Sequence, residues 1–489
     1  MDAAPLVRAR SRSRSADPPL NPLDATAMSV RPYGSIVAVA MTLNYMVGTG
    51  CFGLPYAFYA AGLGLTSIFL IVGFFGSLVT MNYTLETMAR AEGVLSSAKA
   101  SMPENRLTYR KIDFSVIGDL FAGSMGYNVV QTVLVFYCLG SLWSYASIFA
   151  SSIASIFYTF FLHGSCDAYA ADASAGCLEA YYISMAVFSV VAIALVLMDL
   201  GDQAAIQKFL SVYRIVAFFL MLLTLTIKLY HEGADVISAR VSSRGEWAFN
   251  WHNFAVGFGP TLLALNCQYN MPDALQPLHA DEKKNARVVT FTAMTISATI
   301  YLLLGILGAI AFDQINPLVT LMWSDFTGCG NGWTPCPSGQ PTWLGWIVHI
   351  VVILFPVMNI ASTYPLVGLT VGGNILTSLP KSWTAPLGPT RSRNLARLIA
   401  AVPPLILAAI FKKLDAIFTF AGYFGFALGL IIPCWLQVIG IKYCQRTYHS
   451  ELAALTPFNM AYVSTLGFST IFLYATFVLT VIAIASLAF

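Results

Sequence analysis

Residues 44–62 read NYMVGTGCFGLPYAFYAAG, and this stretch decides the fold. Three glycines (Gly48, Gly50 and Gly53) and Pro55 interrupt the middle of an otherwise strongly apolar segment. Glycine costs a helix about 1 kcal/mol relative to alanine, and proline removes a backbone donor. The segment is therefore predicted to span a membrane as a helix that breaks near its centre. Lipid tolerates such a break only where protein or a watery cavity meets the unpaired peptide groups.

Residues 257–276, GFGPTLLALNCQYNMPDALQ, show a similar weakness. Either interruption alone would fit a packing contact or a harmless kink, because glycine and proline are common in membrane helices. Two interrupted spans at matching positions instead indicate a transporter site built on an inverted repeat. Residues of about 31–230 and 249–441 would then form the two halves, and 458–488 would add an extra helix.

A break of this kind exposes backbone groups that suit a zwitterion. The N–H groups that begin a half-helix favour a carboxylate, whereas the carbonyls that end one suit a cation or an ammonium group. We expect the first break to bind the carboxylate and the second to bind the ammonium group. A third span would complete the pocket with Asn128, Gln131 and Tyr137, although a structural role for these three fits equally well. The candidate substrate-binding residues are Gly48, Thr49, Gly50, Cys51, Ala264, Leu265, Asn266 and Asn128.

The composition supports a membrane protein. Only 10% of the 489 residues are charged and 57% are hydrophobic, with a mean hydropathy of +0.71. A soluble domain carries about 25% charged residues, so a soluble enzyme, a nucleic-acid binder and a secreted disulfide scaffold are excluded. The net charge of +3 does not argue for an anionic partner. The partners that we expect are the lipid bilayer and an amino acid substrate, with no nucleic acid.

The apolar runs predict an all-α membrane protein with about eleven transmembrane helices, because a helix needs about 20 apolar residues to cross the bilayer. The runs are too long for the alternating strands of a membrane barrel. A shorter apolar segment, 114–126, is predicted to be an interfacial helix that leads into the third span. The predicted spans are residues 33–60, 62–88, 127–161, 180–199, 207–230, 249–272, 288–312, 341–372, 395–411, 415–441 and 458–488.

The basic residues predict the orientation. If the N-terminus is cytosolic, all but five of the 26 Lys and Arg residues lie in cytosolic segments, as the positive-inside rule requires. The five exceptions are Lys228, Arg240, Arg244, Lys412 and Lys413. Eleven spans would put the C-terminus outside. The pattern does not distinguish the plasma membrane from an endomembrane such as that of a vacuole or lysosome.

Two loops on the outer side contain pairs of cysteines and no Lys or Arg. Residues 162–179 hold Cys166 and Cys177, and residues 313–340 hold Cys329 and Cys336. Each pair is close enough in sequence to form a disulfide, and an oxidising compartment would favour it. Free thiols are the alternative.

Residues 1–30 are polar and rich in Pro, which predicts a disordered cytosolic tail. The RARSRSRS run in this tail serves either as a positive-inside anchor or as a regulatory site at Ser11, Ser13 and Ser15.

The first stretch resembles the first helix of the amino acid/auxin permease family, which includes the sodium-coupled neutral amino acid transporters. The resemblance covers the chain from about Arg31 and is weaker at 266–287 and 362–366. It implies the fold of the bacterial leucine transporter, with five-plus-five inverted repeats, broken helices 1 and 6, and an eleventh helix.

The resemblance also implies a possible sodium site. Asn44 and Thr363 match positions linked to the cation in the sodium-coupled branch. A basic residue that this branch often has after the threonine is missing, since residues 371–374 read VGGN. Other members of the family use protons, so Na⁺ and H⁺ both stay open as the coupling ion. No other cofactor is expected.

Ionisable residues are scarce inside the predicted spans, and Glu86 is predicted to lie at a span end. Arg214, well inside the fifth span, has two interpretations. It either snorkels to the cytosolic surface, or it gates the inner vestibule or supplies a fixed positive charge where relatives bind sodium.

The sequence therefore predicts a secondary active transporter of neutral amino acids. An amino-acid sensor on the same fold is the main alternative. A membrane-embedded enzyme is disfavoured because the six histidines are scattered and form no ligand spacing. An ATP-driven pump is disfavoured because no Gly-rich phosphate loop with a Lys is present.

Overall fold

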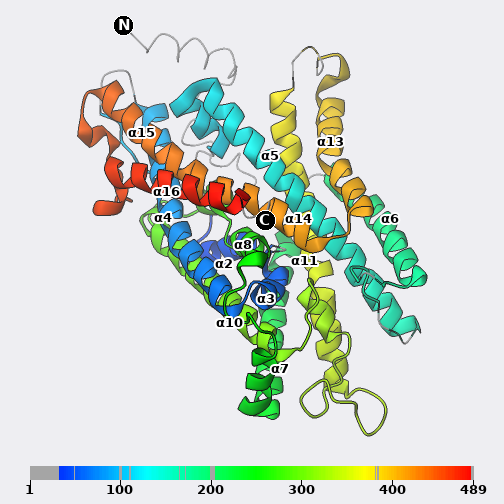
Figure 1. Cartoon of the computed structure of the whole chain (residues 1–489). Helices are drawn as coiled ribbons and strands as arrows, with labels where there is room; N and C mark the ends of the chain where they lie inside the picture. The colour runs from blue at the N-terminus through cyan, green and yellow to red at the C-terminus, as the bar shows by residue number, and fades with distance from the viewer. Residues whose placement is uncertain are drawn as a thin grey trace.

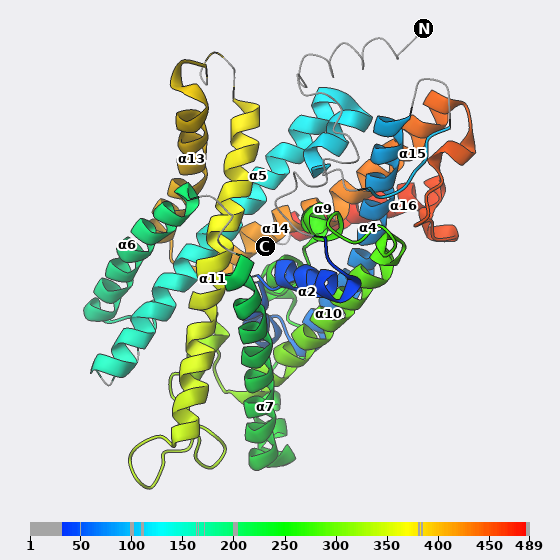
Figure 2. The same cartoon turned by 180° about the vertical axis from the view of Figure 1, so that it is seen from behind.

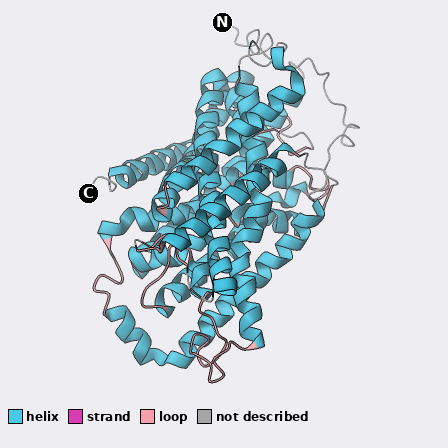
Figure 3. Cartoon of the chain, turned by 90° about the vertical axis from the view of Figure 1, so that its right-hand side faces the viewer, coloured by secondary structure: helices cyan, strands magenta, loops and turns pink. Residues whose placement is uncertain are grey.

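The computed structural model describes residues 32–48, 50–97, 102–108, 112–162, 164, 166–170, 172–198, 204–379, 382 and 385–485. The predicted tail 1–30 and the candidate site residue Thr49 lie outside these residues. The described part consists of helices joined by loops and contains no strand (Figure 3). Its longer helices (Figure 1) are α2 (Ser35–Met46), α3 (Gly50–Ala60), α4 (Leu63–Ser96), α5 (Phe114–Phe157), α6 (Ala175–Leu197), α7 (Ala204–Ser242), α8 (Phe254–Ala264), α10 (Ala286–Ala311), α11 (Trp343–Ser378), α13 (Gly388–Ile410), α14 (Leu414–Phe426), α15 (Ile432–Tyr448) and α16 (Leu466–Ala485), with the short α9 (Met271–Leu275) after α8.

The prediction of an all-α membrane fold is confirmed. In the described part, nine helical stretches are long and apolar enough to cross a bilayer, and the pair α2 and α3 makes a tenth span bent by 57°. The expected sixth span, 249–272, corresponds to α8 and α9, which have 11 and 5 residues. Neither of these helices reaches the roughly 20 residues that a crossing needs.

Several helices differ from the prediction at their ends, among them α4 and α5. The helix α4 continues to Ser96 rather than ending near residue 88. The predicted interfacial helix 114–126 is the first part of α5, which bends at Gly123 with φ 65° and ψ −157°. Only glycine adopts that backbone conformation easily, so the boundary lies three residues earlier than predicted.

The extension of α4 places Glu86 inside the protein, which corrects the prediction that it lies at a span end. Glu86 is fully buried and pairs at 2.7 Å with Arg90, one helical turn further along α4. Gln437 of α15 donates to Glu86 at 2.8 Å, and the hydroxyl of Ser464 also donates to it. This polar network lets the helix continue past its apolar part, because buried charges must be paired and hydrogen-bonded.

The helices form two packing groups. In the first group α3 packs against α8 and α10, and α4 packs against α8, α10 and α15. In the second group α5 packs against α6, α11 and α13. The helix α14 contacts both α8 and α5, and α7 contacts both α10 and α11 (Figure 2). The two groups therefore share α7 and α14 as common neighbours.

The segment before α2 is tied to the loop that follows α9. Tyr33 forms a parallel bridge with Leu278, with its N–H donating to Pro277 and its carbonyl accepting from His279. Next to this bridge, the N–H and hydroxyl of Ser35 both donate to the Glu282 carboxylate. These hydrogen bonds lower the pKa of Glu282. The start of the first broken span is thus attached to the end of the second.

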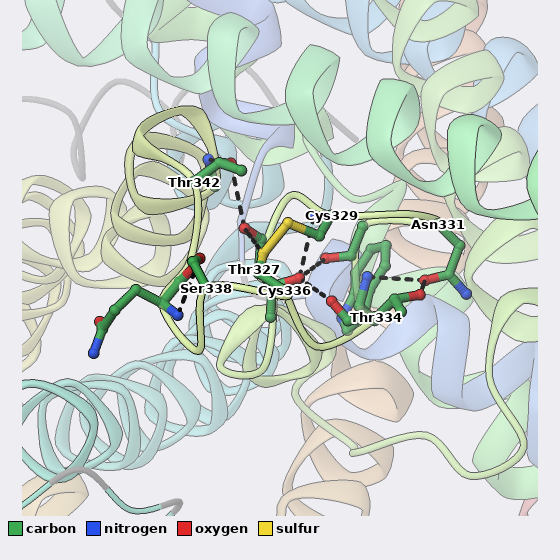
Figure 4. Close-up of a disulfide and its surroundings, with 11 residues drawn as sticks. Thr327, Cys329, Asn331, Thr334, Cys336, Ser338 and Thr342 are labelled. Atoms are coloured by element: carbon green, nitrogen blue, oxygen red, sulfur yellow. Dashed lines mark hydrogen bonds between the residues drawn. A yellow bond between two sulfur atoms is a disulfide. The ribbon is translucent and has the colours of Figure 1, made fainter.

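Both cysteine pairs form disulfides in the structure. Cys166 is bonded to Cys177, and Cys329 to Cys336. Figure 4 shows the second bond within a compact loop in which Thr327 accepts from the Thr342 N–H at 2.9 Å and donates to the Thr334 carbonyl at 2.6 Å. In Figure 1 this loop lies at the opposite end of the molecule from the start of α13.

Candidate functional site

The two broken spans meet at their breaks. A Cβ atom added to Gly50, at the start of α3, would lie 2.5 Å from the backbone nitrogen of Ala264, at the end of α8. Real Cβ atoms do not come so close to backbone, so only glycine allows this approach. The structure therefore brings together the candidate residues Gly48, Gly50 and Cys51 with Ala264 and Leu265.

Side chains from other helices hold the carbonyls that end α2. The Tyr301 hydroxyl of α10 donates to the Met46 carbonyl at 3.0 Å. The Asn359 amide of α11 donates to the Val47 carbonyl at 3.5 Å, and the Cys51 thiol contacts the Gly48 carbonyl at 3.1 Å. These contacts satisfy the orphan carbonyls that a helix end leaves. They also fix the path of the chain through the break.

The second break runs from Leu265 to Asn270 and is stabilised by Gln268. The Gln268 amide oxygen accepts from the Cys267 N–H at 2.9 Å, and its nitrogen donates to Thr80 of α4 at 3.1 Å. The helix α8 ends at Ala264, and the backbone leaves the helical conformation at Cys267, where φ is −144°.

Asn266 is the unusual residue of this break. It is only 4% exposed, and neither its amide oxygen nor its amide nitrogen has a hydrogen-bond partner in the described part of the chain. The amide faces Gly425 and Gly429, where added Cβ atoms would lie 3.3 Å from its nitrogen and 3.0 Å from its oxygen. Gly429 belongs to a π-helical turn, Ala427–Ile431, between α14 and α15. Such turns often mark functional sites, and an unpaired buried amide costs about 1–3 kcal/mol.

Two tyrosines of α5 also reach the breaks. The Tyr145 hydroxyl lies 3.4 Å from the position of a Cβ added to Gly48. Tyr137 packs against Tyr269 of the second break, with ring centroids 5.3 Å apart. Sequence reasoning missed Tyr145, although it shares a helix face with Tyr137 and Ser141 at four-residue intervals, which could have identified it.

The other two candidates on α5 lie nearer the start of the helix. Asn128 is exposed, and the 17 residues that separate it from Tyr145 correspond to about 25 Å of helix. The structure therefore does not bring Asn128 to the breaks. Gln131 is buried, and its amide oxygen and nitrogen have no hydrogen-bond partner in the described part of the chain.

Arg214 of α7 points into the protein rather than to its surface, so it does not snorkel. It is 3% exposed. One guanidinium nitrogen donates to the Asn44 side-chain oxygen at 2.9 Å, and the other donates to the Ser362 hydroxyl at 3.3 Å. Thr363, the second candidate for a sodium ligand, follows Ser362 directly and donates to the Asn359 carbonyl at 2.9 Å. The guanidinium thus occupies the region that the sequence assigned to a cation.

The arrangement can bind and orient a small polar molecule, but it has few groups for catalysis. In the part of the chain that the structure describes, no three His, Cys, Asp or Glu residues come together as metal ligands. The polar groups at the breaks are backbone amides and carbonyls, tyrosine hydroxyls, the Cys51 thiol and the side-chain amides of Asn266, Gln268 and Asn359. These groups suit the two ends of a zwitterion.

Comparisons with known proteins agree with this geometry. The family described as "Transmembrane amino acid transporter protein" matches residues 33–321. The chain is 23% identical to a transmembrane protein 104 homolog of Caenorhabditis elegans over 362 residues, which cover 70% of this chain and 68% of the relative. It is 21% identical to human transmembrane protein 104 over 475 residues, which cover 85% of this chain and 88% of that protein.

A solved structure shares the fold. The crystal structure of MhsT in complex with L-phenylalanine matches with a TM-score of 0.58 at 13% sequence identity, and the match covers 94% of this chain and 99% of MhsT. The likeness shows the leucine-transporter-like fold that the sequence predicts. The division into two five-helix repeats stays a prediction.

Proposed function

We propose that this chain, which belongs to the transmembrane amino acid transporter protein family, is a secondary active transporter that moves neutral amino acids across a membrane by alternating access. The family membership confirms the resemblance to the amino acid/auxin permeases. The proposal adds a mode of transport and a class of substrate to that membership.

The contact between the two breaks is the observation that supports the proposal. Gly50 and Ala264 approach each other as closely as backbone allows, so the N–H groups that begin α3 lie beside the carbonyls that end α8. A substrate carboxylate would bind at the positive end of α3, and its ammonium group would bind at the negative end of α8. Irregular backbone at membrane depth is costly in lipid, so a substrate site is a good reason for keeping it.

The substrate side chain would extend toward Tyr137, Asn266 and Gly429. The side chains at this place are neutral, and Gly425 and Gly429 let the Asn266 amide approach the backbone between α14 and α15, where an added Cβ would lie 3.3 Å from its nitrogen and 3.0 Å from its oxygen. Asn266 offers both a donor and an acceptor. The nearby charge of Arg214 disfavours a cationic side chain, so neutral amino acids are the proposed substrates.

Uptake into proteoliposomes tests the proposal. The purified full-length protein would be reconstituted, and accumulation of each of the twenty radiolabelled L-amino acids would be measured against protein-free liposomes. We expect saturable accumulation of one or several neutral amino acids. The variant Gly373→Ala is a control for glycine substitution and should accumulate the same amino acids as the wild type, because an added Cβ there meets nothing within 4 Å.

The same panel distinguishes a transporter from a sensor. Amino acids that stabilise the purified protein against heat without accumulating in the vesicles would indicate a sensor on the same fold. If no amino acid either accumulates or stabilises the protein, the proposed site is wrong.

A further inference from the structure

We propose that Arg214 is a built-in cation that replaces a sodium ion between α2, α7 and α11, so that substrate transport needs no sodium at this position. The inference rests on the transport function proposed above. It adds that the positive charge between α2, α7 and α11 is the guanidinium of Arg214.

The hydrogen bonds of Arg214 place its charge at that position. The Asn44 side-chain oxygen accepts from the guanidinium at 2.9 Å, and the Ser362 hydroxyl accepts from it at 3.3 Å. Asn44 and Thr363, the neighbour of Ser362, are the two residues that resemble sodium ligands. A sodium ion on the Asn44 oxygen would therefore share its ligand with an existing positive charge. Two positive charges that contact the same oxygen atom repel each other strongly in a protein interior.

Among the residues that the structure describes, no carboxylate forms an ion pair with Arg214. The ion pairs of the described residues use Arg90, Arg106, Lys228 and Arg240, and none of them involves Arg214. Its hydrogen-bond partners, the Asn44 side-chain amide and the Ser362 hydroxyl, are neutral groups. A buried charge at membrane depth is costly and indicates a function.

A substrate would supply the missing negative charge. Cys51 lies in the first turn of α3, where the substrate carboxylate is proposed to bind. Arg214 is hydrogen-bonded to Asn44 of α2, the helix that leads into this break, so its fixed charge adds to the positive end of the α3 dipole. A bound sodium ion would have the same electrostatic effect, and the arginine provides it without an ion gradient.

Arg214 also joins the two packing groups of the fold. Asn44 belongs to α2, which packs against α10, and Ser362 belongs to α11, which packs against α5. A sodium ion between these helices would hold them together by shared coordination. The guanidinium does so by hydrogen bonds in a planar fork, which a lysine ammonium would reproduce only in charge.

The test measures sodium binding without depending on transport. Thermal unfolding of the purified full-length protein would be followed in NaCl, KCl and choline chloride at equal ionic strength. We expect the midpoint of the wild type and of Arg214→Lys to be the same in the three salts. Arg214→Ala exposes the oxygens of Asn44, Ser362 and Thr363 and should gain several degrees in NaCl alone, with saturation. Adding Asn44→Ala to that variant should remove the gain.

Uptake gives a second measurement, with whichever amino acid of the panel accumulates. Wild-type uptake should change less than twofold when choline replaces sodium, and Arg214→Ala should become at least tenfold dependent on sodium. A sodium-specific rise in the wild-type midpoint, or a folded Arg214→Ala that does not respond to sodium, would overturn the proposal. If Arg214→Ala does not fold, the proposal is tested by the wild type and Arg214→Lys. Stabilisation of either protein by NaCl alone overturns the proposal, and equal midpoints in the three salts for both proteins support it. Failure of all amino acids to accumulate counts against the transport function and leaves the sodium result standing.

Discussion

The buried pair of Glu86 and Arg90 should dominate the stability of the end of the molecule where α4 meets α15. Arg90 donates to Glu86 at 2.7 Å, to the Gln437 side chain at 2.6 Å and to the Ala454 carbonyl at 2.7 Å. Arg90 is 1% exposed and Glu86 is fully buried. Water therefore does not screen the pair, and neither charge can be solvated if its partner is removed.

The expected magnitude follows from the charge that is left behind. Removing one partner of a buried ion pair costs about 3–5 kcal/mol, because the other charge stays uncompensated. Glu86→Leu and Arg90→Met should each have this effect. The double variant leaves no charge buried, so it should cost no more than either single change. Part of the loss should remain, because Gln437 then lacks both of its ionic partners.

The measurement is the thermal midpoint of the detergent-purified protein, followed by fluorescence-detected size-exclusion chromatography. At about 2 °C per kcal/mol for a large chain, each single variant should unfold about 6–10 °C below the wild type. Arg106→Met is the matched control, because Arg106 pairs with Glu104 at 3.2 Å while their side chains are 62% and 73% exposed. An exposed pair contributes little, so this control should stay within 2 °C of the wild type. The reasoning is refuted if the single variants also stay within 2 °C, or if the double variant loses the sum of the two single losses.

Three further predictions concern Gly50 and Asn266 at the breaks and the hydrogen bonds between Ser35 and Glu282. Gly50→Ala places a Cβ 2.5 Å from the backbone of α8 and should abolish the folded peak in size-exclusion chromatography. The control Gly373→Ala should give the yield of the wild type, and equal yields of the two variants would contradict the close contact. Asn266→Ala removes a buried amide without a hydrogen-bond partner in the described part, so the thermal midpoint should hold or rise while uptake falls at least tenfold; a lower midpoint with normal uptake would show a purely structural role. The pKa of Glu282 is lowered by the hydrogen bonds from Ser35, so their contribution is full at neutral pH and is lost as the pH falls through the lowered pKa. Glu282→Gln mimics the acid form, and hydrogen–deuterium exchange at pH 7 should show a faster-exchanging Ser35 amide, with unchanged exchange as the contrary result.

The breaks could be predicted from the sequence because their causes are local. Glycine and proline act on the backbone where they stand, so Gly48, Gly50 and Pro260 indicate weak helix wherever the neighbours are. The pairing of the two breaks was also within reach, since matching interruptions indicate a repeat.

Other features depend on contacts that no local pattern contains. Glu86 was expected at a span end because the apolar run stops there, but α4 continues through charged residues that Gln437 and Ser464 satisfy from more than 350 positions away. The sequence could not decide whether Arg214 points to lipid headgroups or to the interior. That direction depends on how α7 is rotated against α2 and α11, which supply the partners of Arg214. Asn128 was chosen for its polarity alone, whereas the rotation and depth of α5 bring Tyr145 to the site instead.

The contacts between the two packing groups around the site are made by side chains, and this bears on how transport would proceed. The breaks of α2–α3 and α8 belong to the same group and touch through backbone, so they can move only together. The contacts from this group to α11 include hydrogen bonds such as that from Asn359 to the Val47 carbonyl at 3.5 Å, and the edge-to-face packing of Phe52 on Phe355 with ring centroids 5.2 Å apart. A net hydrogen bond is worth about 0.5–1.5 kcal/mol, and substrate binding can supply several times that amount. A rocking motion that exchanges such hydrogen bonds costs far less than one that separates Gly50 from Ala264. Alternating access in this protein should therefore preserve the junction of the breaks and change what surrounds it.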